Sequence, residues 1–247
     1  MEDLIVARCS KVHRIYVLGG RGTCCSDDPR LPGGRHPLAE GGTSSPQSST
    51  TTIPQQIVVE GDAKVDIVVL VYPGVSCDVK LDVKLAGEGA EANVYGAYVC
   101  GGDERVKISV DMHHDVPHCN SRQLFKGIAG GTSRVDFYGK IIVAQDAQRT
   151  EAYQENHNIL LTDGAKVDTK PQLEIYADDV KCSHGATIGR LNEEEQFYMR
   201  SRGISLEDAK VLQMISFIAP VLENIEDEAE RERMTAQFEA AIRNLVR

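Results

Sequence analysis

A cysteine and a histidine separated by one residue form the most chemically suggestive pair in this sequence. They are Cys182 and His184, in the segment KCSHGATIG at residues 181–189. In an extended strand, residues two apart point to the same face and lie about 7 Å apart along the chain. A thiolate and a neutral imidazole are ligands for iron, zinc or copper, although two ligands leave such a site half built. Alternatively, Cys182 packs as a small apolar residue and His184 bonds a backbone carbonyl in a tight turn.

The segment MHHDVPHC, residues 112–119, has the highest density of metal-ligand residue types. Its spacing fits no standard zinc pattern, because His113 and His114 would face opposite sides of a strand and Pro117 would force a bend. We therefore expect a strand that ends at a turn.

A third candidate is the alternating set Glu174, Tyr176 and Asp178, which would share one face of a strand. Two carboxylates on one face could serve acid–base chemistry, and the simpler alternative is a solvated sheet face. The sequence contains no Walker loop, nucleophile elbow or dinucleotide fingerprint. Nothing therefore supports nucleotide hydrolysis within this chain.

Charge and composition narrow the possible partners and compartments. The chain carries 27 Lys and Arg against 37 Asp and Glu, a formal charge of -10, which repels phosphate backbones and anionic lipid. We expect no nucleic-acid partner and no membrane span, since the longest apolar stretch, 67–72, is far shorter than the roughly 20 residues required. The acidic N-terminus lacks a signal-peptide core, and seven cysteines without a CxxC pair predict free thiols in the cytoplasm.

The first 56 residues are expected to form a short strand followed by a linker. Residues 14–18 form the candidate strand, and residues 19–54 are so rich in Gly, Pro, Ser and Thr that we predict a partly disordered loop. The pair Cys24 and Cys25, with His36, lies in this linker and is interpreted as incidental.

Residues 57–189 are expected to form a β core. Alternating, β-branched runs such as VKLDVKL and VDFYGKIIV are broken by Gly, Asp and Asn, with no long helix between them. A short pattern of small, polar, apolar and Asp/Asn residues recurs at 63–66, 90–93, 133–136 and 165–168, each time shortly after a glycine. Such recurrence favours a stacked solenoid, and a β-sandwich stays open as the alternative.

Residues 190–247 are expected to form a helical domain. Asn192 with Glu195 caps a helix at about 193–202 that Gly203 stops, and Ser205 with Asp208 caps a second helix. We expect Pro220 to kink or split the second helix, and a third helix to cover 227–245. The expected buried stripes are Leu206, Ala209, Leu212, Ile215 or Met214, Ile218, Leu222 and Ile225 on the second helix, and Met234, Phe238, Ile242 and Leu245 on the third.

Several ordered segments resemble the SufB/SufD family of iron-sulfur cluster assembly proteins. They are AQDAQRTEAYQ at 144–154, KPQLEI at 170–175, DDVKCSHGAT at 178–187 and FYMRSRGI at 197–204. The resemblance covers about residues 57–225 and is closest to the SufD members. A B-type chain would carry a cluster-related cysteine where Asn156, His157 and Asn158 precede Ile159.

This resemblance implies a fold, partners and a role. It implies a right-handed parallel β-helix followed by a small α-helical domain, which pairs with a SufB-like subunit or with a second copy of itself. The C-terminal helices would dock a SufC-like ATPase of the ABC type. His184 and Cys182 would be the metal- and cofactor-binding residues for a transient iron-sulfur cluster at the subunit interface. The resemblance implies a non-catalytic scaffold subunit, with no catalytic residues, no enzymatic activity and no permanently bound cofactor.

Two other functions stay open at this stage. β-Helices also serve as carbohydrate-active enzymes such as polysaccharide lyases, for which Glu174 and Asp178 would be the candidate carboxylates. The chain could also be a purely structural β-solenoid that forms a homodimer without metal.

Overall fold

The structure is a computed structural model that describes residues 4–19, 53–54 and 56–246. Its described part contains twelve strands in two parallel six-stranded sheets. The odd sheet holds β1 (Leu4–Val6), β3 (Gln56–Val59), β5 (Cys77–Leu85), β7 (Arg105–His114), β9 (Arg134–Val143) and β11 (Lys166–Ile175). The even sheet holds β2 (Lys11–Leu18), β4 (Lys64–Val71), β6 (Glu91–Cys100), β8 (Asn120–Ala129), β10 (Glu151–Leu160) and β12 (Lys181–Gly189).

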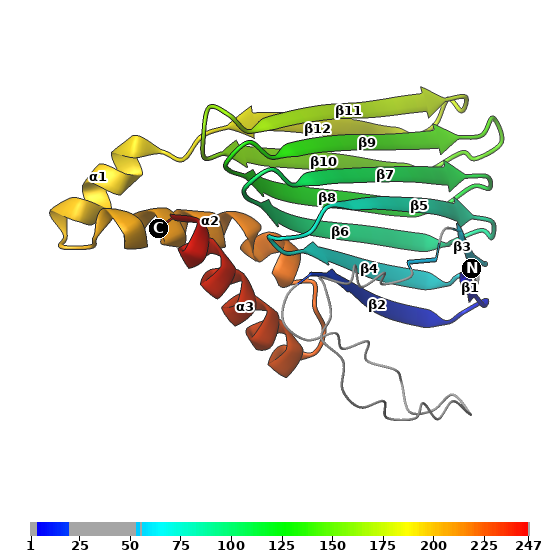
Figure 1. Cartoon of the computed structure of the whole chain (residues 1–247). Coiled ribbons are helices and arrows are strands. Elements are labelled where there is room, and N and C mark those ends of the chain that lie inside the picture. The colour runs from blue at the N-terminus through cyan, green and yellow to red at the C-terminus, as the bar shows by residue number, and fades with distance from the viewer. Residues whose placement is uncertain (1–3, 20–52, 55, 247) are drawn as a thin grey trace, which may run out of the picture.

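Successive strands alternate between the two sheets, so each coil contributes one strand to each sheet. Every strand pair is parallel and lies one coil apart, as for β8 with β10 and β10 with β12. Figure 1 shows the coils stacked from β1 and β2 at one end to β11 and β12 at the other. This architecture is a parallel β-helix, which confirms the predicted solenoid and rules out the sandwich.

A left-handed residue recurs at the same corner of each coil. Positive φ angles occur at Cys9, Asp62, Gly89, His118 and Arg149, each two residues before a strand of the even sheet. Only glycine adopts this conformation without steric cost, so the four side chains at these corners are held there by the stacked turns above and below. The recurring corner keeps the strands of successive coils in register.

The recurring sequence pattern also lies at strand starts, at β4 and β6 of the even sheet and at β9 and β11 of the odd sheet. Lys64 lies in register with Glu91 on the even sheet, and Arg134 with Lys166 on the odd sheet. The small residue before each of them is buried, as at Ala63 and Ala90. The interior between the sheets is filled mainly by Val, Ile, Leu and Ala side chains that point inward from alternate strand positions.

The N-terminal strands belong to the β-helix, which differs from the expected isolated strand at 14–18. β2 pairs with β4 residue by residue from Lys11 to Leu18, and β1 pairs with β3. Parallel pairing joins segments far apart in sequence, so local patterns at 14–18 cannot reveal it. The predicted linker at 19–54 lies almost entirely outside the described residues.

Three helices follow the last strand: α1 (Glu193–Ser201), α2 (Leu206–Leu222) and α3 (Glu228–Val246). The predicted caps are confirmed, because Asn192 Oδ1 accepts hydrogen bonds from the Glu194 and Glu195 amides and Ser205 Oγ accepts from the Asp208 amide. Pro220 does not split α2, which ends two residues later.

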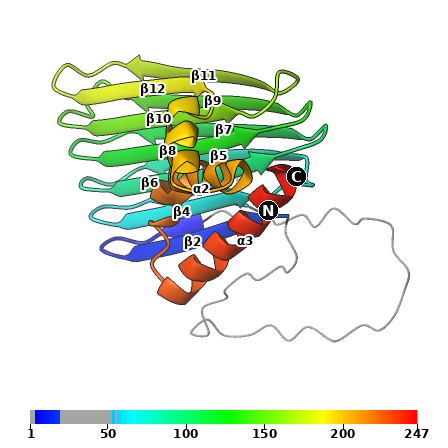
Figure 2. The ribbon, with the colours of Figure 1, turned by 90° about the vertical axis from the view of Figure 1, so that its left-hand side faces the viewer.

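Helices α2 and α3 cover the outer face of the even sheet, as Figures 1 and 2 show. The shared apolar layer joins Val68, Leu70, Tyr72, Tyr95, Ala97, Val99 and Ile128 of the strands to Val211, Met214, Ile218, Met234, Phe238 and Ile242 of the helices. The expected buried stripe of α2 was wrong at Leu206 and Leu212, which are exposed. Apolar residues surround much of α2, so sequence spacing alone did not identify the side that meets the sheet.

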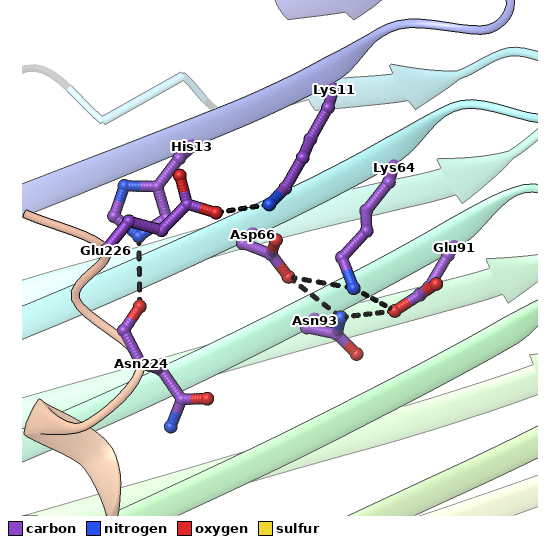
Figure 3. A network of polar contacts seen from close by, with 8 residues as sticks. All are labelled: Lys11, His13, Lys64, Asp66, Glu91, Asn93, Asn224 and Glu226. Carbon is purple, nitrogen blue, oxygen red and sulfur yellow. Dashed lines mark hydrogen bonds and ion pairs between the residues drawn. The ribbon is translucent and has the colours of Figure 1, made fainter.

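A polar network fastens the connection between α2 and α3 to the first coils (Figure 3). Its members are Lys11 and His13 on β2, Lys64 and Asp66 on β4, Glu91 and Asn93 on β6, and Asn224 and Glu226 after α2. Lys11 pairs with Glu226, and the His13 ring lies 3.1 Å from the Asn224 carbonyl oxygen. The hydrogen bond from Lys11 lowers the pKa of the Glu226 carboxyl. Residues about two hundred positions apart are thereby held together.

Candidate functional site

Cys182 and His184 lie on β12, the last strand of the even sheet. β12 pairs only with β10, so its other edge is unpaired within the described part of the chain. Cys182 contacts the interior core, and His184, two residues further, faces the same side of the strand. The predicted common face of the two side chains is therefore present.

The two side chains differ in exposure. Cys182 is half-buried, whereas His184 is exposed. Burial raises the pKa of the Cys182 thiol. At neutral pH this favours the protonated form, so metal binding by Cys182 would have to release a proton.

The described part of the chain supplies at most two donors at this position. Within the described residues, no group of three or more His, Cys, Asp or Glu side chains is arranged to hold a metal ion. A tetrahedral iron or zinc centre built on Cys182 and His184 would need its remaining ligands from outside the described residues.

Polar side chains line the interior of the β-helix just below this pair. They are Gln123 on β8 and Gln154, Asn156 and Asn158 on β10, all buried. Gln154 Nε2 donates a hydrogen bond to Gln123 Oε1 at 2.8 Å, and Asn158 Nδ2 donates to Asn156 Oδ1 at 2.6 Å. The sequence analysis missed this cluster. In the sequence, the cluster corresponds to polar residues at alternate positions 154, 156 and 158. Because residues 155 and 157 are also polar, the sequence alone does not indicate which set faces the interior.

The side chains of the MHHDVPHC segment point in different directions. His113 lies on the outer face, where its Nε2 is 3.3 Å from Asp82 Oδ1. His114 is buried, and its Nε2 lies 2.8 Å from Ser121 Oγ. His118 lies at an exposed corner, with its Nε2 3.7 Å from Glu88 Oε1. Cys119 is buried, and its Sγ lies 3.4 Å from the Gly87 carbonyl oxygen. The expected strand ending at a turn is confirmed, because β7 ends at His114.

The other two candidates do not form sites. The prediction that Glu174, Tyr176 and Asp178 share a strand face was wrong, because β11 ends at Ile175 and the chain then turns. Glu174 Oε1 instead pairs with Lys140 Nζ at 2.7 Å, as on a solvated sheet face. Cys24, Cys25 and His36 lie outside the described residues.

The C-terminal helices carry exposed apolar side chains. Phe197 and Tyr198 on α1 are 72% and 60% exposed, and Leu206 and Leu212 on α2 are also exposed. Helix α1 extends away from the strands (Figure 1) and buries only Gln196, which hydrogen-bonds Gln213 of α2. Groups of exposed aromatic and aliphatic residues mark surfaces for contact with other molecules. We call these four side chains the helical patch.

Fold and site together define a parallel β-helix protein with a half-buried Cys and an exposed His on its last strand, followed by a helical extension. Comparison with known families makes this specific. Residues 44–217 match the family model "SUF system FeS cluster assembly, SufBD core domain". The chain belongs to this family, as the resemblance predicted.

Individual relatives agree with this assignment. The chain is 48% identical over 127 residues to the iron-sulfur cluster assembly protein SufD of Escherichia coli, an alignment that covers 51% of the chain. It is 46% identical over 117 residues, 47% of the chain, to an iron-sulfur cluster assembly SufBD family protein of Synechocystis. A SufBD family protein of Mycobacterium leprae is 32% identical over 169 residues, 65% of the chain.

These alignments cover only 30%, 25% and 43% of the lengths of the three relatives. The chain therefore matches less than half of each relative. Among the described residues, no helix is both long and apolar enough to cross a membrane.

Proposed function

We propose that this chain is a SufD-like, non-catalytic scaffold subunit for iron-sulfur cluster assembly. In this proposal His184 is a cluster ligand and Cys182 a supporting thiol, and the cluster is the assembled product rather than a resident cofactor. The observation that carries the proposal is the incomplete donor pair on an exposed last strand of a SufBD-family β-helix.

The unpaired edge of β12 supports pairing with a second β-helix. Nine residues, Lys181–Gly189, present backbone groups that no strand pairs within the described part of the chain. Such an edge is a template for strand addition by another chain. A SufB-like partner docked there would place its own donors close to His184 and complete the coordination sphere. Free thiols persist in a reducing cytoplasm, where we place this assembly.

The helical patch supports docking of an ABC-type, SufC-like ATPase. Phe197 and Tyr198 project from a helix that contributes little to the core, so a partner can bury them without unfolding the chain. Because α2 also packs on the even sheet, force applied at α1 and α2 would reach β8 and its neighbours. Nucleotide-driven movement at the helices would then alter the pairing edge.

The test is reconstitution of the full chain with SufB-like and SufC-like proteins, followed by addition of iron and sulfide. Mass measurement reports the complex, and visible absorption reports the cluster. We expect His184→Ala to leave the complex intact and to lower bound cluster at least tenfold. His113→Ala, on the outer face of β7, is the matched control and should leave cluster content unchanged.

Other outcomes would identify a different function. Unchanged cluster content in His184→Ala removes the ligand assignment. If the chain forms only a homodimer and no ATPase co-purifies, the structural solenoid is the better description.

A further inference from the structure

The buried amide pair below His184 is incompletely hydrogen-bonded. Gln154 Nε2 donates to Gln123 Oε1, but Gln154 Oε1 and Gln123 Nε2 are both buried without a hydrogen-bond partner among the described residues. Burying a polar atom without a partner destabilises the fold, so each such atom calls for an explanation. Gln154 Oε1 is therefore a hydrogen-bond acceptor to which no described residue donates.

His184 continues the line of stacked side chains that begins with Gln123 and Gln154. Gln123, Gln154 and His184 lie in register on β8, β10 and β12, one coil apart. Stacked amides on successive strands form ladders in which each donates to one neighbour and accepts from the other. Because the amino end of Gln154 is directed at β8, its carbonyl end is directed away from β8, on the side of β12.

The opposite sheet leaves room for this arrangement. Gly139 on β9 faces Gln154 across the interior, and a Cβ at this glycine would lie 2.1 Å from Gln154 Nε2. The missing side chain creates the slot that holds the Gln154 amide. The Gln154 amide is thus confined by packing against Gly139 on one side and by its hydrogen bond to Gln123 on the side of β8.

We propose that Gln154 is a positioning residue for His184: rotation of the His184 side chain would bring one ring N–H to Gln154 Oε1, which no described residue bonds in the structure, and this hydrogen bond would fix a single tautomer. The other ring nitrogen then keeps its lone pair, directed at the open end of the β-helix. Metal-binding histidines generally donate their second ring nitrogen in this way. A neutral amide acceptor stabilises the neutral imidazole that a metal requires, without adding a buried charge. This inference rests on the proposed ligand role of His184.

Thr169 offers the alternative acceptor in the same coil. It lies on β11, on the same strand face as the core-contacting Val167, and its Oγ1 is also buried without a partner among the described residues. Thr169 belongs to the opposite sheet, whereas Gln154 is the in-register neighbour of His184. Register therefore favours Gln154, and the two can be separated by mutation.

The first test uses the isolated full chain, without partner or cluster. Long-range ¹H–¹⁵N spectra of histidine-labelled protein report the tautomer of each ring, and His184→Ala assigns the relevant signals. In the neutral ring we expect one fixed protonated and one fixed unprotonated nitrogen for His184. Averaged shifts from two exchanging tautomers in the wild type would overturn the inference, whatever the variants do.

Three variants identify the acceptor. Gln154→Met keeps the length but removes the acceptor, so the His184 shifts should become averaged. Gln154→Glu keeps an acceptor and should retain the single tautomer. Thr169→Val is the matched control and should change nothing; a change in Thr169→Val but not in Gln154→Met would refute the assignment to Gln154.

Cluster retention gives a second, separable readout. In the reconstituted complex, Gln154→Met should lower retained cluster roughly tenfold and Gln154→Glu should preserve it. If His184→Ala leaves cluster content unchanged while the tautomer depends on Gln154, the proposed function fails and the positioning contact stands. If His184→Ala abolishes the cluster but Gln154→Met does not affect it, the positioning role fails alone.

Discussion

The Tyr98 hydroxyl on β6 hydrogen-bonds Asn158 on β10 by reaching past the strand that lies between them. The intervening residue, in register with both, is Gly127 on β8. A Cβ at this glycine would lie 1.8 Å from Tyr98 Cε2 and 2.6 Å from Asn158 Oδ1. The interior network therefore depends on an absent side chain at residue 127.

Gly127→Ala should destabilise the β-helix by about 3 kcal/mol, at the upper end of what overpacking costs, because neither the ring nor the amide can withdraw from a filled core. Urea unfolding followed by circular dichroism measures this. Gly189→Ala is the control, since nothing lies within 4 Å of a Cβ there. Equal midpoints for the two variants would show that the interior tolerates the extra methyl group.

The sequence was informative where a local rule decides the structure. Asn192 and Ser205 are caps because their side chains meet nearby amides, and the recurrent small residues at strand starts mark stacked turns. Likewise, Cys182 and His184 share a face because alternation fixes it locally. These features need only a few neighbouring residues.

Sequence reasoning failed where the answer depends on distant partners. Nothing near residues 11–13 indicates that β2 pairs with β4. Leu212 and Met214 are both apolar positions on α2, and only docking on the even sheet decides that Met214 is buried. The role of Gln154 is hidden for the same reason, since its neighbours Gln123 and His184 are each about 30 residues away.

His114 should make stability depend on pH. Burial lowers the pKa of its imidazole to about 4, whereas an unfolded chain titrates near 6.5. The unfolded state then binds the extra proton more readily, so this contribution is fully present above about pH 6.5 and is lost as pH falls toward 4. The maximum loss is about 3 kcal/mol. Unfolding free energies measured at several pH values should show this slope.

The matched variants for this effect are neighbours on one strand. His114→Gln removes the titrating ring and should flatten the slope between about pH 4 and 6.5. His113→Gln, which changes the adjacent residue on the outer face, should retain it. If both variants keep the wild-type slope, another group controls the acid sensitivity.

Helix α1 should contribute to binding and little to folding. Because Phe197 and Tyr198 are 72% and 60% exposed, replacing both with Ala should change unfolding free energy by less than about 0.5 kcal/mol. The same double variant should weaken binding of a SufC-like ATPase at least 30-fold, as expected for aromatic hot spots of 2 kcal/mol or more. Calorimetric titration measures the affinity, with Glu194→Ala as the surface control. Undiminished affinity would place the ATPase contact elsewhere on the chain.

Phe238 should control attachment of the helical domain to the β-helix. Its ring stacks on that of Tyr72, the residue directly after β4, with centroids 4.2 Å apart, and both residues are buried. Phe238→Ala removes this contact and leaves a cavity between α3 and β4, at an expected cost of about 3–5 kcal/mol. Because the interior core lies on the other face of the even sheet, the helices should detach before the strands unfold. Hydrogen exchange should then show faster exchange in α3 but unchanged protection in β8 and β10, and simultaneous loss of protection in helices and strands would show that they unfold as one unit.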